Sequence, residues 1–160
     1  MQHLSLGIDV GSTTAKTVFL ESDRRVAYSS YQRHDARTVD TLRETLSEAL
    51  REVGDAHVEV LVTGSAGMGI SERFNLPFVQ EVISSAEVVR QLFPQVKTLI
   101  DIGGEDAKMI FFKDAGVPDI RMNGSCAGGT GAFIDEMSDL LGVPVADLNE
   151  LAGESTTLYP

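Results

Sequence analysis

A twelve-residue pattern occurs twice in this chain of 160 residues, at Ile8–Phe19 and again at Ile100–Phe111. The copies lie 92 residues apart, and Ile, Asp, Gly, Ala, Lys and Phe recur at the same places in both. Each copy predicts a strand, a glycine turn and a second strand. Two unrelated β-hairpins would not be expected to share an Asp and a Lys that packing does not require. The repeat therefore indicates a duplicated supersecondary unit, and it disfavours a TIM barrel, a helical bundle and a P-loop enzyme.

Around the repeat, apolar periodicity predicts an α/β fold. The clearest helix is Thr38–Val53, with Thr38 as its cap, Gly54 after its end and one apolar face made of Val39, Leu42, Leu46, Leu50 and Val53. Glycines at positions 64, 67 and 69 interrupt the pattern after the fourth strand. Strands are expected at Leu4–Val10, Lys16–Leu20, Val26–Tyr31, Val58–Val62, Lys97–Ile102, Lys108–Phe112 and Ile120–Met122, and further helices at Ile83–Phe93, Thr130–Leu141 and Val145–Ala152.

The turn of each copy has the residue types that bind phosphate groups. Glycine lets backbone N–H groups approach phosphate oxygens, hydroxyls add donors, and lysine adds a point charge. The chain has neither a GxxxxGK[ST] loop nor a GxGxxG turn after its first strand, so P-loop and dinucleotide sites are disfavoured. The candidate nucleotide-binding residues are Gly11, Ser12, Thr13, Thr14, Lys16, Gly103, Gly104, Asp106 and Lys108. Among them, Asp106 is either an ordinary turn acid or a group that orients the attacking water or holds Mg²⁺.

The acidic residues of the copies have two interpretations each. Asp9 and Asp101 are either turn-forming residues at strand ends or catalytic carboxylates that hold Mg²⁺ through water, and their recurrence favours the second. Glu105 is either an ordinary turn acid or the group that orients the attacking water. Lys16 and Lys108 are alternatively solvated surface charges, and Lys16 is the better candidate ligand because the hairpin folds it back toward Asp9.

Composition excludes several function classes. The formal net charge is −11 with scattered basic residues, which disfavours binding to nucleic acid or an anionic membrane. The N-terminus has no signal-peptide pattern, no window is apolar enough to span a membrane, and Cys126 is the single cysteine. A cytoplasmic protein is therefore expected. His3, His34 and His57 form no cluster with Cys126 in the sequence and are predicted to lie on the surface.

Four stretches carry a family resemblance: Gly7–Lys16, Thr63–Gly69, Asp101–Lys108 and Asn123–Gly131. They resemble the activator ATPases of (R)-2-hydroxyacyl-CoA dehydratases and related benzoyl-CoA reductase subunits, within the actin, Hsp70 and sugar-kinase superfamily. The resemblance implies RNase-H-like domains with a mixed sheet and flanking helices, which clamp ATP or ADP with Mg²⁺. Residues 1–96 would form one complete domain, and residues 97–160 the first half of a second.

The same resemblance implies a redox role. Members of this family are homodimers that share one four-iron–four-sulfur cluster, with two cysteines from each subunit, and Cys126 matches the first of these. ATP hydrolysis drives a low-potential electron, received from ferredoxin or flavodoxin, into a dehydratase or reductase partner. The chain has no cysteine after Cys126 and ends before the family's adenosine-binding segment, which is expected of a fragment. Two alternatives stay open: a sugar or acyl kinase, and a nucleotide-binding regulatory module without redox activity.

Overall fold

The computed structural model describes residues 2–113, 117–123 and 128–157. Contacts group the chain into two compact units, residues 1–99 with 110–119 and residues 100–109 with 120–160. No helix among the described residues is long and apolar enough to cross a membrane. The domain boundary predicted between residues 96 and 97 stays a prediction.

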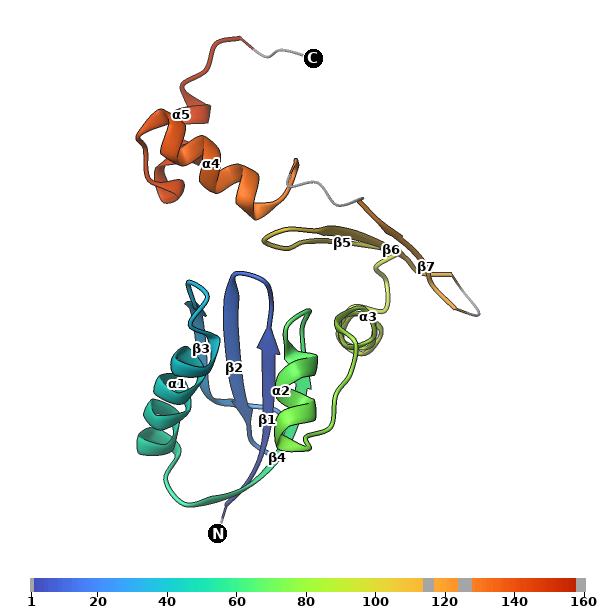
Figure 1. The fold of residues 1–160 in the computed structure, drawn as a ribbon. Helices are drawn as coiled ribbons and strands as arrows, with labels where there is room; N and C mark the ends of the chain where they lie inside the picture. The colour runs from blue at the N-terminus through green and yellow to red at the C-terminus, as the bar shows by residue number, and fades with distance from the viewer. Residues whose placement is uncertain (1, 114–116, 124–127, 158–160) are drawn as a thin grey trace. The chain divides into compact units, whose positions relative to one another are not determined.

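Four strands form the first sheet, which is mixed (Figure 1). They are β1 (Gln2–Val10), β2 (Thr14–Leu20), β3 (Val26–Arg33) and β4 (Ala56–Thr63), in the order β3-β2-β1-β4. Strands β1, β2 and β3 form an antiparallel meander, whereas β4 runs parallel to β1. The register places Asp9 at the end of β1 opposite both Lys16 of β2 and Thr63 of β4. The predicted α/β fold with a mixed, RNase-H-like sheet is confirmed.

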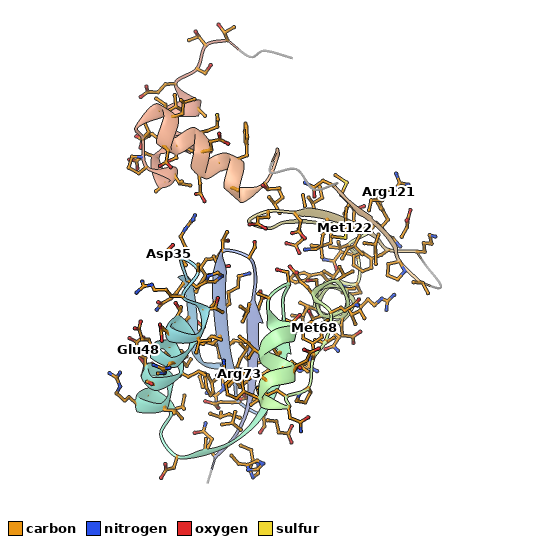
Figure 2. All side chains as sticks on the ribbon, in the orientation of Figure 1. Asp35, Glu48, Met68, Arg73, Arg121 and Met122 are labelled. Atoms are coloured by element: carbon orange, nitrogen blue, oxygen red, sulfur yellow. The ribbon has the colours of Figure 1, made fainter. Side chains whose placement is uncertain are left out.

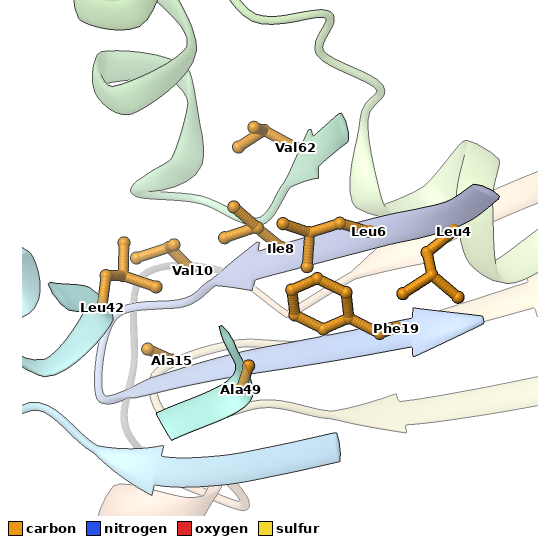
Figure 3. Packing of buried hydrophobic residues seen from close by; sticks show 9 residues of the cluster. All are labelled: Leu4, Leu6, Ile8, Val10, Ala15, Phe19, Leu42, Ala49 and Val62. Carbon is orange, nitrogen blue, oxygen red and sulfur yellow. The ribbon is translucent and has the colours of Figure 1, made fainter. Parts of the chain in front are cut away.

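Alternation along β1 explains where the core lies. Leu4, Leu6, Ile8 and Val10 are buried on one face of the sheet, and Figure 3 shows them beside Phe19 of β2. The helix α1 (Thr38–Val53) covers this face, and its start and end agree with the prediction. Every second side chain of this central strand points into the core and is removed from water. Burial of this apolar cluster is therefore the main contribution to the stability of the sheet.

Part of the predicted apolar face of α1 is confirmed, because Leu42 is buried and Leu46 and Val53 pack against the core. Val39 and Leu50 are 46% and 58% exposed. The buried positions are Thr41, Leu42, Thr45 and Ala49. The small side chains of Thr41, Thr45 and Ala49 let the helix lie close to the sheet. The residue before the helix is Arg37, and no side chain caps the helix, so the capping role predicted for Thr38 is wrong.

A helix that the sequence did not predict follows β4. This helix, α2 (Gly67–Phe74), begins at a glycine because a Cβ at Gly67 would lie 3.1 Å from Cγ1 of Val62. Packing against the sheet therefore selects a residue that is a poor helix former on its own. The next helix, α3 (Glu81–Leu92), agrees with the prediction to within two residues and ends before Pro94.

The second copy of the repeat forms part of another sheet. Its strands are β5 (Thr98–Ile102), β6 (Ala107–Phe111) and β7 (Asp119–Met122), in the order β5-β6-β7. Thr130 precedes α4 (Gly131–Leu141), and Gly142, with φ of 64°, ends it in the left-handed conformation. The chain continues through the 3₁₀ turn η1 (Val145–Asp147) into α5 (Leu148–Gly153). Within the described residues α4 buries Ser138, while its apolar Leu140 stays 76% exposed.

Candidate functional site

The first glycine loop is a tight turn between β1 and β2. The Gly11 N–H donates to the Thr14 carbonyl at 2.9 Å and so closes the turn. Ser12 is exposed, and Thr13 and Thr14 are half-buried. Among the described residues, neither the Ser12 nor the Thr13 N–H donates a hydrogen bond to another protein group. The turn therefore presents two unused backbone donors beside a hydroxyl, which is the arrangement that binds anions.

An ion pair lies at the base of this turn. The Lys16 ammonium is 2.9 Å from the Asp9 carboxylate, and the two side chains are 41% and 24% exposed. The same ammonium lies 5.3 Å from the centre of the Tyr31 ring. Partial burial lowers the pKa of Lys16. The hydrogen bond and charge of Asp9, with smaller contributions from Tyr31 and Glu81, outweigh this and hold the pKa above its ordinary value. A lysine here is therefore a permanent cation at neutral pH.

The loop after β4 presses against Asp9. Gly64 has φ of 93°, and a Cβ on it would lie 2.4 Å from Oδ1 of Asp9 and 2.3 Å from the Val10 carbonyl oxygen. The Ala66 N–H donates to the same Val10 carbonyl at 2.9 Å. Only glycine fits this conformation and this space. Gly64 was not among the predicted site residues. Its position directly after the strand that pairs with β1 could have indicated a close approach to Asp9.

Asp9 and Lys16 border a groove on the sheet face opposite the core. The groove has a volume of about 650 Å³, and its lining also includes Thr63, Val18 and Leu61. Much of this lining is apolar, which explains why the pair is partly removed from water. The hydroxyl oxygen of Thr63 is buried and has no hydrogen-bond partner among the described residues. An orphaned hydroxyl next to a carboxylate is a place where a ligand or its water would be bound.

The second loop repeats the closing bond of the first. The Gly103 N–H donates to the Asp106 carbonyl at 2.8 Å, and these residues correspond to Gly11 and Thr14. A Cβ at Gly103 would lie 2.7 Å from Oδ1 of Asp106, so any other residue here would displace that carboxylate. Asp101 is half-buried at the end of β5, and Glu105 is exposed. The duplicated unit predicted from the sequence therefore has the same backbone turn in both copies.

The lysine of the second loop has a different environment. Lys108 is 5% exposed, and its ammonium lies 3.0 Å from the carboxylate of Asp106. Its alternative interpretation as a solvated surface charge is therefore wrong. A buried ammonium needs a carboxylate partner to offset its lost hydration. Lys108 is thus held next to the loop it belongs to.

The start of α4 braces the second loop. The Gly131 N–H donates to the Gly103 carbonyl at 2.9 Å, and the Ala132 N–H donates to the Gly104 carbonyl at 2.8 Å. A Cβ at Gly131 would lie 3.2 Å from the Gly103 carbonyl oxygen, and Thr130 is fully buried. Thr130 and Gly131 belong to the glycine-rich stretch at 123–131. Its Cys126, the predicted cluster ligand, lies outside the described residues.

The predicted surface location is confirmed for His3 and His57 and is wrong for His34. His3 and His57 are exposed on neighbouring strands, with ring centres 5.1 Å apart. His34 is only 5% exposed and follows β3 directly. Its ring nitrogen Nε2 lies 3.1 Å from the Gly11 carbonyl oxygen. His34 therefore belongs to the first loop, which sequence reasoning missed.

Comparison with known proteins identifies the family. The sequence pattern of the BadF/BadG/BcrA/BcrD ATPase family matches residues 6–159, nearly the whole chain. The chain belongs to this family. Its similarity extends to the (R)-2-hydroxyglutaryl-CoA dehydratase activating ATPase of Acidaminococcus fermentans, which is 34% identical over 158 residues, covering 98% of this chain and 60% of the relative. Membership in a family of ATPases is the broad functional fact that follows.

Solved structures agree with this assignment. The fold matches component A of the Acidaminococcus fermentans (R)-2-hydroxyglutaryl-CoA dehydratase with a TM-score of 0.82 and 32% identity, over 98% of this chain and 61% of that one. It matches the ADPNP-bound activator of the 2-hydroxyisocaproyl-CoA dehydratase of Clostridium difficile with a TM-score of 0.79 and 28% identity, over 98% and 59%. The chain thus spans about 60% of the length of these family members. The roles of individual site residues stay predictions.

Proposed function

We propose that this chain binds Mg²⁺–ATP through its two glycine loops and takes part in hydrolysing it. The protein it represents would use this reaction to drive low-potential electrons into a 2-hydroxyacyl-CoA dehydratase or a benzoyl-CoA-reductase-type enzyme. The observation that carries the proposal is the pair of turns, each closed by one glycine N–H bond, in a member of an ATPase family. Relatives named as dehydratase activators support the choice of partner, and the ADPNP-bound neighbour supports the choice of nucleotide.

The first loop has the donor set for one end of the triphosphate. The N–H groups of Ser12 and Thr13 and the Lys16 ammonium would bind phosphate oxygens, and Asp9 would hold Mg²⁺ through water. The unpartnered Thr63 hydroxyl beside Asp9 supports this assignment. Mg²⁺ keeps several of its waters in such sites and neutralises charge on the phosphates.

The second loop would provide the groups that act on the attacking water. Gly103 and Gly104 would bring backbone donors to the phosphates, and Asp101 would hold a water of the magnesium shell. Glu105, which is exposed in this turn, would orient the water that attacks the terminal phosphate. Lys108 pairs with Asp106 and would fix the position of that carboxylate.

An iron–sulfur cluster requires more than this chain contains. A four-iron–four-sulfur cluster takes four thiolate ligands, and Cys126 is the only cysteine among the 160 residues. We propose that Cys126 provides one ligand to a cluster shared between two subunits of the full-length protein. When bound, the cluster would supply the low-potential electron that ferredoxin or flavodoxin delivers. The cytoplasmic location expected from the sequence belongs to the same proposal.

Nucleotide binding is tested by calorimetric titration with Mg²⁺–ATP. Wild type should bind, and Asp9→Asn should weaken binding at least about tenfold, since it removes a charge but keeps the shape of the side chain. Asp101→Asn should abolish hydrolysis while binding is retained. Hydrolysis that persists in this variant would count against the role of Asp101. Binding without any turnover in wild type would favour the regulatory module.

The redox role is tested separately on the full-length protein, purified without oxygen. Iron and acid-labile sulfide are measured for wild type and Cys126→Ser. About four irons per dimer that disappear in the variant would support the activator. Iron-free protein with normal ATP hydrolysis would contradict the redox role and favour a kinase or sensor instead.

A further inference from the structure

We infer that His34 is a positioning residue that fixes the first glycine loop in its nucleotide-binding conformation. The inference rests on the proposed ATP site and adds a residue to it. His34 is 5% exposed, although it lies at the end of β3 and 23 residues from the loop in sequence. Burial costs an imidazole its hydration, and only Nε2 of His34 regains a hydrogen bond, because Nδ1 is buried with no partner among the described residues. The contacts of this ring and of its own backbone therefore indicate its role.

His34 holds the loop by two hydrogen bonds. Its ring Nε2 lies 3.1 Å from the Gly11 carbonyl oxygen, and its backbone N–H donates to the Thr13 carbonyl at 3.1 Å. Because a carbonyl oxygen only accepts, Nε2 is the donor in the ring bond. The two bonds engage carbonyls on both sides of Ser12 and leave the N–H groups of Ser12 and Thr13 unused within the described chain. These are the donors that the phosphate requires.

A strained turn holds His34 in this position. Asp35 and Ala36 have φ of 44° and 61°, and the Arg37 N–H donates to the His34 carbonyl at 2.6 Å. Two successive left-handed residues closed by this bond form a type I′ turn, which costs energy at a residue such as alanine. Figure 2 shows Asp35 at the end of the sheet where the β1–β2 turn lies. A strained turn is retained only where the contacts around it offset its cost, as the two hydrogen bonds of His34 do here.

The second copy of the repeat provides an independent argument. The Gly103 carbonyl corresponds to the Gly11 carbonyl, and it also accepts a hydrogen bond from outside the hairpin, from the Gly131 N–H. A helix start thus does in the second loop what the imidazole of His34 does in the first. The same carbonyl needs a donor in both copies, which indicates that the bond sets the conformation of the turn.

The test compares His34→Asn with His34→Gln. Glutamine places its amide nitrogen about where Nε2 lies, whereas asparagine is too short to reach Gly11 and is well tolerated in turns. In titrations with Mg²⁺–ADPNP, H34N should bind about tenfold more weakly than wild type, and H34Q within about twofold of it. His57→Asn, at an exposed histidine of the same unit, is the matched control and should bind like wild type.

Amide hydrogen exchange gives a second readout that does not depend on nucleotide. H34N should exchange the Gly11–Thr14 amides faster than wild type, while the amides of β4 stay unchanged. Equal binding and equal exchange in wild type and H34N would overturn the inference. If wild type does not bind nucleotide, the proposed function fails, and the exchange rates still decide whether His34 fixes the loop.

Discussion

The two glycine loops share a backbone turn but differ in how their lysines are used. Lys16 pairs across the hairpin with Asp9 and is 41% exposed in its side chain, whereas Lys108 pairs with Asp106, two residues before it, and is 6% exposed. The first loop is braced by His34 and Gly64, and the second by the start of α4. The difference teaches that the repeat specifies the turn, while the residues around each copy decide which side chains remain available to a ligand.

The largest effect is expected at the loop that presses on Asp9. Gly64→Ala should lower the free energy of unfolding by about 3 kcal/mol, because it combines a left-handed backbone with a clash against Asp9 and Val10. Gly54→Ala is a matched control, since Gly54 has φ of 69° but no atom within 4 Å of its added Cβ. It should cost only the backbone strain, about 1 kcal/mol. Urea unfolding of both variants measures the difference.

An equal loss of unfolding free energy in Gly64→Ala and Gly54→Ala would contradict the role given to Gly64 in the first loop. It would mean that the close approach to Asp9 relaxes at no cost and that only backbone conformation constrains Gly64. Loss of nucleotide binding in Gly64→Ala alone, with stability as expected, would instead connect the loop after β4 directly to the site.

A second prediction separates the two lysines. Lys108→Ala should lower the free energy of unfolding by about 2 kcal/mol, because it leaves Asp106 without its partner and removes buried methylenes. Lys16→Ala should change stability by less than about 1 kcal/mol, since its pair is substantially hydrated. The same substitution should weaken Mg²⁺–ATP binding roughly tenfold or more. Unfolding curves and calorimetry on both variants test this, and the opposite pattern would assign the phosphate contact to Lys108.

The sequence was sufficient for the parts of the fold that depend on local pattern. The period of Thr38–Val53 predicted the bounds of α1, and the repeat predicted both hairpins and their turns. The buried face of α1 was predicted only in part, since Leu42, Leu46 and Val53 pack against the core. The other buried positions are two threonines and an alanine, because close approach to the sheet favours small side chains over the larger apolar ones at 39 and 50.

Long-range packing explains the features that were missed. Gly67 begins α2 where the Val62 side chain leaves little space for a Cβ, and this contact depends on the packing of the helix against the sheet. His34 is buried because its ring bonds to a main-chain carbonyl, which has no residue-type signature in the sequence. Lys108 and Lys16 occupy the same position in the repeat, so the sequence did not predict that only Lys108 is buried. Burial depends on the segments that pack around each hairpin. The site residues were thus predictable as a set, but their individual environments were not.

The smallest expected effect concerns pH. The pKa of Lys16 is raised above its ordinary value of 10.5 because the bond and charge of Asp9 outweigh burial. A raised lysine pKa contributes stability that is complete below the unfolded value and is lost as pH rises through the folded value. The contribution should stay below about 1 kcal/mol, because the pair is partly solvated. Wild type should therefore lose its small advantage over Lys16→Ala only above about pH 10.5, in unfolding curves measured from pH 8 to 12. An advantage that already disappears near neutral pH would mean that another group is responsible, and it would remove the ion pair as a distinguishing feature of the first loop.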